Sequence, residues 1–91
     1  MAKITFENPG SPAGFLAVLM AQNVELPLQP SEHEAGVLLD AQGRDVITID
    51  VNGARPDEEV VALTAYICMA VNQAGGFKVL RAECTDLEPT P

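Results

Sequence analysis

The clearest structural pattern in this sequence is GVLLDAQGRDVITIDV, which occupies residues 36–51. Two segments rich in apolar residues, 36–40 and 45–51, flank a turn at residues 41–44. An aspartate before the turn and a glycine that can adopt the left-handed conformation are typical of a tight β-hairpin with a bulge. The second segment alternates in polarity, which predicts an antiparallel sheet with one buried face. Its apolar members are Ile47, Ile49 and Val51, and its polar members are Thr48 and Asp50.

Helix signals lie on both sides of this hairpin. Ser11 followed by Pro12 is a typical helix start, because serine caps the helix and proline is tolerated at the first helical position. This pair predicts a helix over residues 12–22. A second helix is predicted over residues 56–74, where three carboxylates in the first turn interact favourably with the helix dipole. The glycine pair that follows it suits a left-handed C-cap.

Weaker patterns complete the order of elements. Residues 3–7 alternate as a short strand, residues 77–84 read as a last strand, and residues 24–35 read as an extended, acidic connector. The order is then β-α-β-β-α-β, an α+β fold in which two helices pack on one face of a small, mainly antiparallel sheet of three or four strands. We expect a single domain at residues 1–84 and a flexible tail at residues 85–91.

The charge of the chain is strongly negative. Its 91 residues include thirteen Asp or Glu and five Lys or Arg, a formal net charge of −8. Nucleic acids and anionic membranes attract positive charge, so we expect neither as a direct partner. The N-terminus lacks the apolar stretch of a signal peptide, and two cysteines are too few for a disulfide scaffold. We therefore expect a cytoplasmic protein.

Side chains that could carry chemistry are few and scattered. His33, Cys68 and Cys84 could in principle form a metal or nucleophilic site, but none has a partner at a typical ligand spacing. A solvated histidine and buried structural thiols are the preferred interpretation. Residues 40–45 lack the spaced carboxylates and terminal glutamate of a calcium loop. We predict that the protein is not an enzyme and has no catalytic residue, metal or cofactor.

Both predicted helices carry more apolar residues than a one-sided sheet covers. In the second helix the stripe that suits a sheet is Val60, Leu63, Ile67, Ala70 and Val71. The apolar residues that remain are Val61, Ala62, Tyr66, Cys68 and Met69. The first helix shows the same excess at Phe15, Leu16, Val18, Leu19 and Met20.

A helix that is apolar nearly all round is either buried on two sides or covered by a partner. We therefore expect a twofold homodimer. The residues expected in its interface are Val61, Ala62, Tyr66 and Met69. In the alternative, the acidic connector folds over this face.

The negative charge favours a protein partner with a basic surface. The carboxylates expected to meet it, on the connector and at the start of the second helix, are Glu25, Glu32, Glu34, Asp57, Glu58 and Glu59. In the alternative, the charge only keeps the protein in solution.

One longer pattern resembles a protein family. Residues 39–46 (LDAQGRDV) are followed by Ala62, by Ala65-Tyr66-Ile67 and by Ala70-Val71-Asn72. Together they resemble small uncharacterised phage and prophage proteins, in which a DAxGR hairpin leads into a helix that ends near AVN. The resemblance covers about a third of the chain, implies no activity and transfers no functional residue. It implies a mobile-element context, in which small acidic proteins such as anti-CRISPR proteins inhibit host nucleic-acid-handling machinery.

Two functional hypotheses follow from the sequence. The first is a non-enzymatic, acidic protein-binding module that inhibits such machinery. The second is a structural or assembly homodimer, in which the apolar helices are the functional surface and there is no inhibitory role.

Overall fold

The computed structural model describes residues 5–78 of the chain. Its elements in order are α1 (Pro12–Ala21), β1 (Gln29–Pro30), β2 (Val37–Leu39), β3 (Asp45–Thr48) and α2 (Asp57–Ala74). The strands form one antiparallel sheet in the order β1-β2-β3. Two helices and an antiparallel sheet confirm the predicted α+β class. Neither helix within residues 5–78 combines the length and the apolar character needed to span a bilayer.

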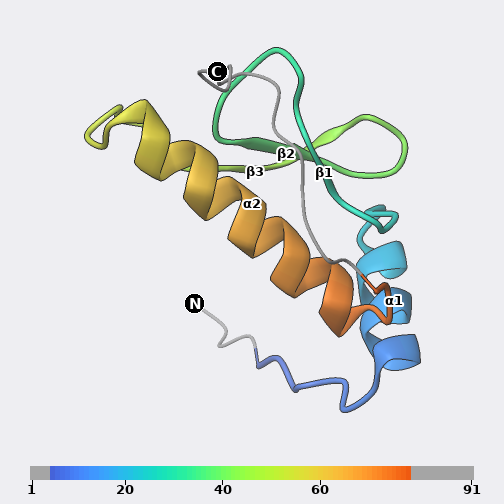
Figure 1. The fold of residues 1–91 in the computed structure, drawn as a ribbon. Helices are drawn as coiled ribbons and strands as arrows, with labels where there is room; N and C mark the ends of the chain where they lie inside the picture. Colours follow the sequence, from blue (N-terminus) through green and yellow to red (C-terminus); the bar gives the residue numbers. More distant parts are fainter. Residues whose placement is uncertain (1–4, 79–91) are drawn as a thin grey trace.

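The two helices are placed differently relative to the sheet. Figure 1 shows α2 running diagonally along the sheet, with α1 beside the C-terminal end of α2. Within the described residues α2 contacts β1 and β2, whereas α1 contacts α2. The prediction that both helices pack on one face of the sheet is therefore not confirmed.

Strands β2 and β3 form the predicted hairpin. Leu38 lies opposite Ile47 and Leu39 lies opposite Asp45, so a bulge interrupts the register between the two leucines. Gly43 has a φ of +83°, and its N–H donates to the carbonyl of the aspartate that starts the turn at 2.9 Å. The hairpin and its bulge are confirmed.

The second strand of the hairpin is shorter than predicted. It ends at Thr48, and Val51 is 77% exposed instead of facing the core. Asp50 has a φ of +57°, and its carboxylate accepts the backbone N–H groups of Ala54 and Arg55 at 3.0 and 2.8 Å. These bonds turn the chain toward α2, because a short acidic side chain can bond the backbone that follows it.

The two terminal strands do not form in the described part of the chain. Of the strand predicted at residues 3–7, the described part is irregular, and its first two residues lie outside the described range. Of the strand predicted at residues 77–84, the first two residues are irregular and the others lie outside that range, as does the tail predicted at residues 85–91.

The connector predicted at residues 24–35 is a structural part of the fold. It contains β1 and buries both Leu26 and Leu28. A strand interrupted by proline is confined to a sheet edge, and Pro30 occupies that position in β1. The sequence interpretation missed this strand because Pro27 precedes it and Pro30 lies within it, and prolines at such spacing are typical of loops.

The ends of the helices follow the predicted signals. Ser11 Oγ accepts the N–H of Gly14 at 3.0 Å as the N-cap of α1. At the end of α2, Gly76 has a φ of +93° and the N–H of Phe77 donates to the carbonyl of Asn72 at 2.9 Å. These are the features of a Schellman motif, so the left-handed C-cap is confirmed at the second glycine of the pair.

The buried face of α2 differs from the predicted stripe. Its buried residues are Val60, Thr64, Cys68 and Asn72, spaced by four. Of these, Cys68 belongs to the core cluster with Leu26, Leu28 and Leu38, and Ile67 and Val71 of the predicted stripe pack against that cluster. Cys68 lies in the core, which confirms the expected buried thiol but not its place on the surplus face, whereas Ala70 was predicted to face the sheet but is exposed. Thr64 is accommodated because its hydroxyl donates to the carbonyl of Val60 at 2.7 Å.

Asn72 joins α2 to the first strand by pairing with the backbone of one residue. Its Oδ1 accepts the N–H of Leu28 at 2.7 Å, and its Nδ2 donates to the carbonyl of Leu28 at 2.9 Å. Cys68 Sγ donates to the same carbonyl at 3.3 Å. The amide thus satisfies both backbone groups of a buried residue, as a neighbouring strand would.

Replacing Asn72 by leucine is expected to lower the free energy of unfolding by about 2–4 kcal/mol. The substitution keeps a side chain of similar size but leaves the buried N–H of Leu28 without a partner and its carbonyl with only the thiol. Urea unfolding measures the loss. Gln73→Leu, at the exposed neighbouring position, should change the stability by less than about 0.5 kcal/mol. Equal stability of the two variants would contradict this role for Asn72.

Candidate functional site

Helix α1 exposes an apolar surface. None of its ten residues, PAGFLAVLMA, carries a charged or hydrogen-bonding side chain, and none is buried. Phe15, Leu16 and Leu19 pack against the core, while Val18 and Met20 are exposed. Soluble helices normally place polar residues on the side that faces water. The described part of the chain therefore leaves one side of α1 without the polar surface expected there.

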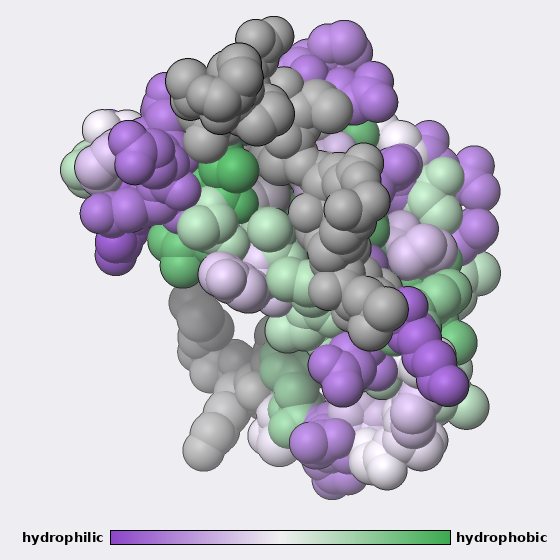
Figure 2. All heavy atoms as spheres, in the orientation of Figure 1, coloured by the Kyte–Doolittle hydropathy of each residue, from purple (hydrophilic) through white to green (hydrophobic). Residues whose placement is uncertain are grey.

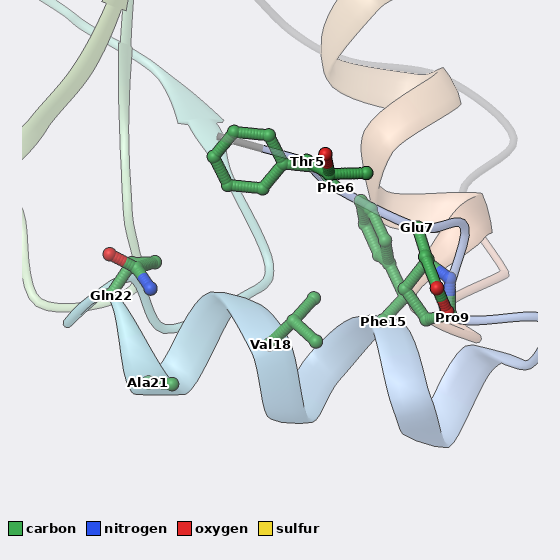
Figure 3. A pocket seen from close by; sticks show the side chains of 8 residues that line it. All are labelled: Thr5, Phe6, Glu7, Pro9, Phe15, Val18, Ala21 and Gln22. Atoms are coloured by element: carbon green, nitrogen blue, oxygen red, sulfur yellow. The ribbon is translucent and has the colours of Figure 1, made fainter. Parts of the chain in front are cut away.

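A groove runs beside this helix. Residues 5–9 lie alongside α1 and enclose a space of about 440 Å³. In Figure 3 the rings of Phe6 and Phe15 and the side chain of Val18 turn toward this space. The residues that line it are Thr5, Phe6, Glu7, Pro9, Phe15, Val18, Ala21 and Gln22. The groove thus has apolar walls with a carboxylate and an amide at its margin.

The groove was not predicted from the sequence. Phe6 was assigned to a strand, yet its side chain is 85% exposed. Phe15 and Val18 were recognised only as part of an apolar excess in the first helix. That excess was the available signal, because the sequence gives no indication that residues 5–9 lie along α1.

The predicted acidic residues separate into two groups. The loop at residues 31–36 lies against the start of α2, where a Cβ atom added to Gly36 would be 2.9 Å from Cγ1 of Val60. The exposed carboxylates at this end of the molecule are Glu32, Glu34, Asp57, Glu58 and Glu59. Figure 2 shows hydrophilic residues gathered where α2 begins. Of this group, Glu59 forms an exposed ion pair with Arg55 at 3.2 Å.

Glu25 lies apart from this group, beside the turn of the hairpin. It is half-buried, and its Oε1 accepts a hydrogen bond from Gln42 Nε2 at 2.9 Å. Its carbonyl accepts the N–H of Ala41 at 2.7 Å. Glu25 therefore helps to hold the hairpin turn, and five of the six predicted carboxylates remain as an acidic surface.

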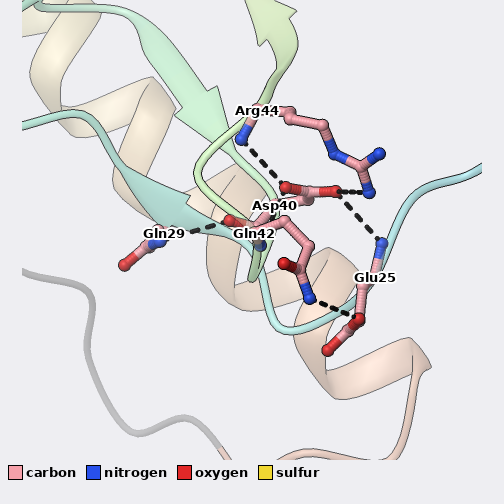
Figure 4. Close-up of polar contacts among 5 residues, drawn as sticks. All are labelled: Glu25, Gln29, Asp40, Gln42 and Arg44. Carbon is pink, nitrogen blue, oxygen red and sulfur yellow. Dashed lines mark hydrogen bonds and ion pairs between the residues drawn. The ribbon is translucent and has the colours of Figure 1, made fainter.

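Asp40 is a fully buried carboxylate that organises the hairpin turn (Figure 4). Its Oδ1 accepts the N–H groups of Gln42 and Arg44, both at 3.0 Å. Its Oδ2 accepts the N–H of Glu25 at 3.3 Å and pairs with the Arg44 guanidinium at 3.0 Å. Both oxygens of Asp40 thus accept hydrogen bonds, from four donors in all. This arrangement agrees with the predicted hairpin turn.

The hydrogen bonds to Asp40 change its acidity. They lower the pKa of the carboxyl to about 2 from an ordinary value of 3.8, led by the backbone N–H of Arg44. Burial acts in the opposite direction, and the N–H of Glu25 and the Arg44 guanidinium lower the pKa further. The donors favour the charged form more than burial disfavours it.

The remaining predicted residues are dispersed. His33 is exposed, and its backbone N–H donates to Ser31 Oγ at 3.0 Å. Cys68 is buried in the core. Cys84 lies outside the described residues. Within residues 5–78 no three His, Cys, Asp or Glu side chains are grouped as metal ligands.

The residues predicted for a dimer interface are partly separated. Tyr66 is 68% exposed and Ala62 is exposed, while Val61 and Met69 are half-buried. At about 100° per residue, Val61 lies roughly 140° around α2 from Tyr66, beside the face that meets the core. The outer face of α2 therefore presents Ala62 and Tyr66, and the half-buried Met69 lies at the edge of this face.

Comparison with protein-family models, with curated proteins and with solved structures gave no match to this chain.

We expect Asp40 to make the stability of the protein depend on pH below about 4. Because its pKa is lower in the fold than in the unfolded chain, its contribution is complete above pH 3.8 and is lost as the pH falls toward 2. Asp40→Asn should be less stable than the parent at pH 6 and should lose less stability between about pH 4 and pH 2. Urea unfolding across this range measures both. Asp45→Asn, at an exposed position of the same hairpin, serves as the control. A parent protein whose stability is as flat as that of Asp40→Asn would contradict the assignment.

Proposed function

We propose that the protein is a non-enzymatic protein-binding module that receives a basic segment of a partner protein in the groove beside α1. The observation that carries this proposal is the composition of α1, ten residues without a polar side chain of which none is buried. An apolar helix surface that the fold leaves exposed is typical of a protein interaction site.

The groove suits the side chain of arginine or lysine. The aliphatic part of such a side chain packs on apolar walls, here Phe6, Phe15 and Val18. Its cationic end is attracted both to the face of an aromatic ring and to a carboxylate, which Glu7 supplies. The net charge of −8 attracts a basic partner over a longer distance and speeds association.

The biological role that we propose is inhibition of a host protein that handles nucleic acid, in the cytoplasm. Such proteins carry basic surfaces that neutralise phosphates. The acidic surface at the start of α2 and the acidic composition of the chain support competition for a surface of this kind. The resemblance to phage and prophage proteins implies no activity by itself, but it implies a mobile-element context, in which inhibitors of the anti-CRISPR type occur.

Truncating Phe6 should weaken binding of a basic peptide without affecting the fold. The probe is a fluorescent 15-residue peptide of arginine and leucine, and fluorescence anisotropy measures its affinity. Phe6→Ala is expected to reduce the affinity roughly thirtyfold, because truncation of an aromatic residue that anchors an interface costs about 2 kcal/mol or more. Tyr66→Ala removes an aromatic side chain of comparable exposure from α2 and should leave the affinity unchanged.

Salt provides a second readout in the same assay. Raising the salt concentration should weaken binding, since charges contribute to it. Equal losses in the Phe6 and Tyr66 variants, or no peptide binding at low salt, would refute the groove as the binding site.

Self-association through α2 is a second candidate, favoured by the exposure of Tyr66 on the outer face of that helix. This homodimer should have about twice the chain mass of 9.6 kDa in analytical ultracentrifugation. Tyr66→Arg should restore the monomer, because a buried cation without a partner is unfavourable. Ala17→Arg, at an exposed position of α1, is the matched control. A monomer at high micromolar concentration would rule out this dimer.

A further inference from the structure

The outer edge of β1 is closed to further strands. The N–H of Ser31 donates to Val37 of β2 at 2.9 Å, so in an antiparallel ladder Leu28 and Pro30 direct their backbone groups away from β2. Both outward groups of Leu28 are bonded to Asn72. Pro30 has no N–H to offer. A side-chain amide and a proline therefore block this edge.

The outer edge of β3 is open in the described part of the chain. The N–H of Ile49 donates to Gly36 at 2.7 Å and Ile47 lies opposite Leu38, so the isoleucines direct their backbone groups toward β2. The alternate residues, Val46 and Thr48, direct theirs away. Within residues 5–78 no strand lies beyond β3, and the side chains of both residues are exposed, Val46 by 37%.

Strand β3 carries neither proline nor lysine, two residues that commonly protect an edge. The sequence of β3 is Asp-Val-Ile-Thr, with neither residue and with three β-branched side chains that favour extended backbone. Within residues 5–78 one edge of the sheet is thus blocked and the other is left open to pairing.

We propose that the open edge of β3 binds an extended, lysine- or arginine-containing segment of a partner protein as an added strand. Backbone hydrogen bonds from Val46 and Thr48 would supply the pairing, as in other cases of strand addition. Asp45 is exposed at the start of the strand and Asp50 lies just beyond its end. Arg44, which precedes Asp45, is paired with Asp40, and Arg55, which follows Asp50, is paired with Glu59. A basic strand therefore complements this edge.

Charge also distinguishes the partner strand from a second copy of this chain. Pairing of two copies through β3 would bring together two chains of net charge −8, which repel each other. The β3 edge and the groove beside α1 are separate surfaces (Figure 1). The inference about β3 therefore goes beyond the proposed use of the groove and stands or falls independently of it.

Hydrogen exchange of the full-length protein provides the first test. In the protein alone the amides of Val46 and Thr48 should exchange at least tenfold faster than those of Ile47 and Ile49, which face β2. Adding a heptapeptide of alternating valine and lysine should slow exchange at the two outward amides and shift their NMR signals. Slow exchange at both amides in the monomer alone would show that the chain itself covers the edge and would overturn the proposal.

Variants of Thr48 provide the second test. Thr48→Pro removes an N–H that faces away from β2, so the hairpin is retained, and the affinity for the valine–lysine peptide should fall roughly tenfold. Thr48→Val keeps the N–H and should bind as the parent does. Val46→Lys, which protects the edge by charge alone, should also reduce the affinity and remains informative if the proline variant fails to fold. Gln73→Leu, at an exposed position of α2, should bind this peptide as the parent does.

Three results would contradict the proposal. A peptide of alternating valine and glutamate that binds as well as the lysine peptide would overturn the charge requirement. Self-association of the parent protein that Thr48→Pro abolishes would assign the edge to a second copy and overturn the proposed partner. Unchanged peptide affinity in Thr48→Pro and Val46→Lys would overturn the edge as the site.

Discussion

The amide of Asn72 holds both backbone groups of Leu28, and much of the structure depends on this pairing. It joins the helix near its C-terminus to Leu28, the residue that precedes the two-residue strand β1. An unpaired buried amide is costly, so the contact sets the rotation of α2 about its axis. That rotation carries Thr64 and Cys68 inward and turns Tyr66 outward. The surface that α2 presents is thus determined by a polar contact in the core.

Asp40 plays a comparable part at the hairpin turn. It accepts the N–H groups of Gln42 and Arg44 in the turn and that of Glu25, fifteen residues earlier in the chain. The chain between α1 and β1 is therefore held to the hairpin by the Asp40 carboxylate together with one backbone bond, from Ala41 to the carbonyl of Glu25. In a small domain, polar contacts of this kind replace regular secondary structure where the strands are too short to supply it.

The parts of the fold that the sequence predicts are those with local causes. The hairpin depends on turn residues next to the strands that they join, and both helices begin or end at capping residues. Strand β1 depends on Asn72, which lies 44 residues away from Leu28. A hydrophobic pattern assigns polar residues to the surface, so it misplaced the inward face of α2. The groove beside α1 was missed because it requires residues 5–9 to lie along α1, and no local sequence signal indicates that arrangement.

The distribution of polar groups supports binding as the function. The four buried polar residues that the structure describes are Ser31, Asp40, Thr64 and Asn72. Each bonds nearby backbone: Ser31 accepts from its own loop, Thr64 donates within α2, and the other two join separate segments. These groups serve the architecture. The surfaces that remain are aromatic rings beside α1, exposed carboxylates at the start of α2 and the backbone edge of β3. Rings and carboxylates attract cationic side chains, and a strand edge accepts an extended backbone. All three features therefore suit the same kind of partner, a basic protein segment, although they lie on different elements of the fold.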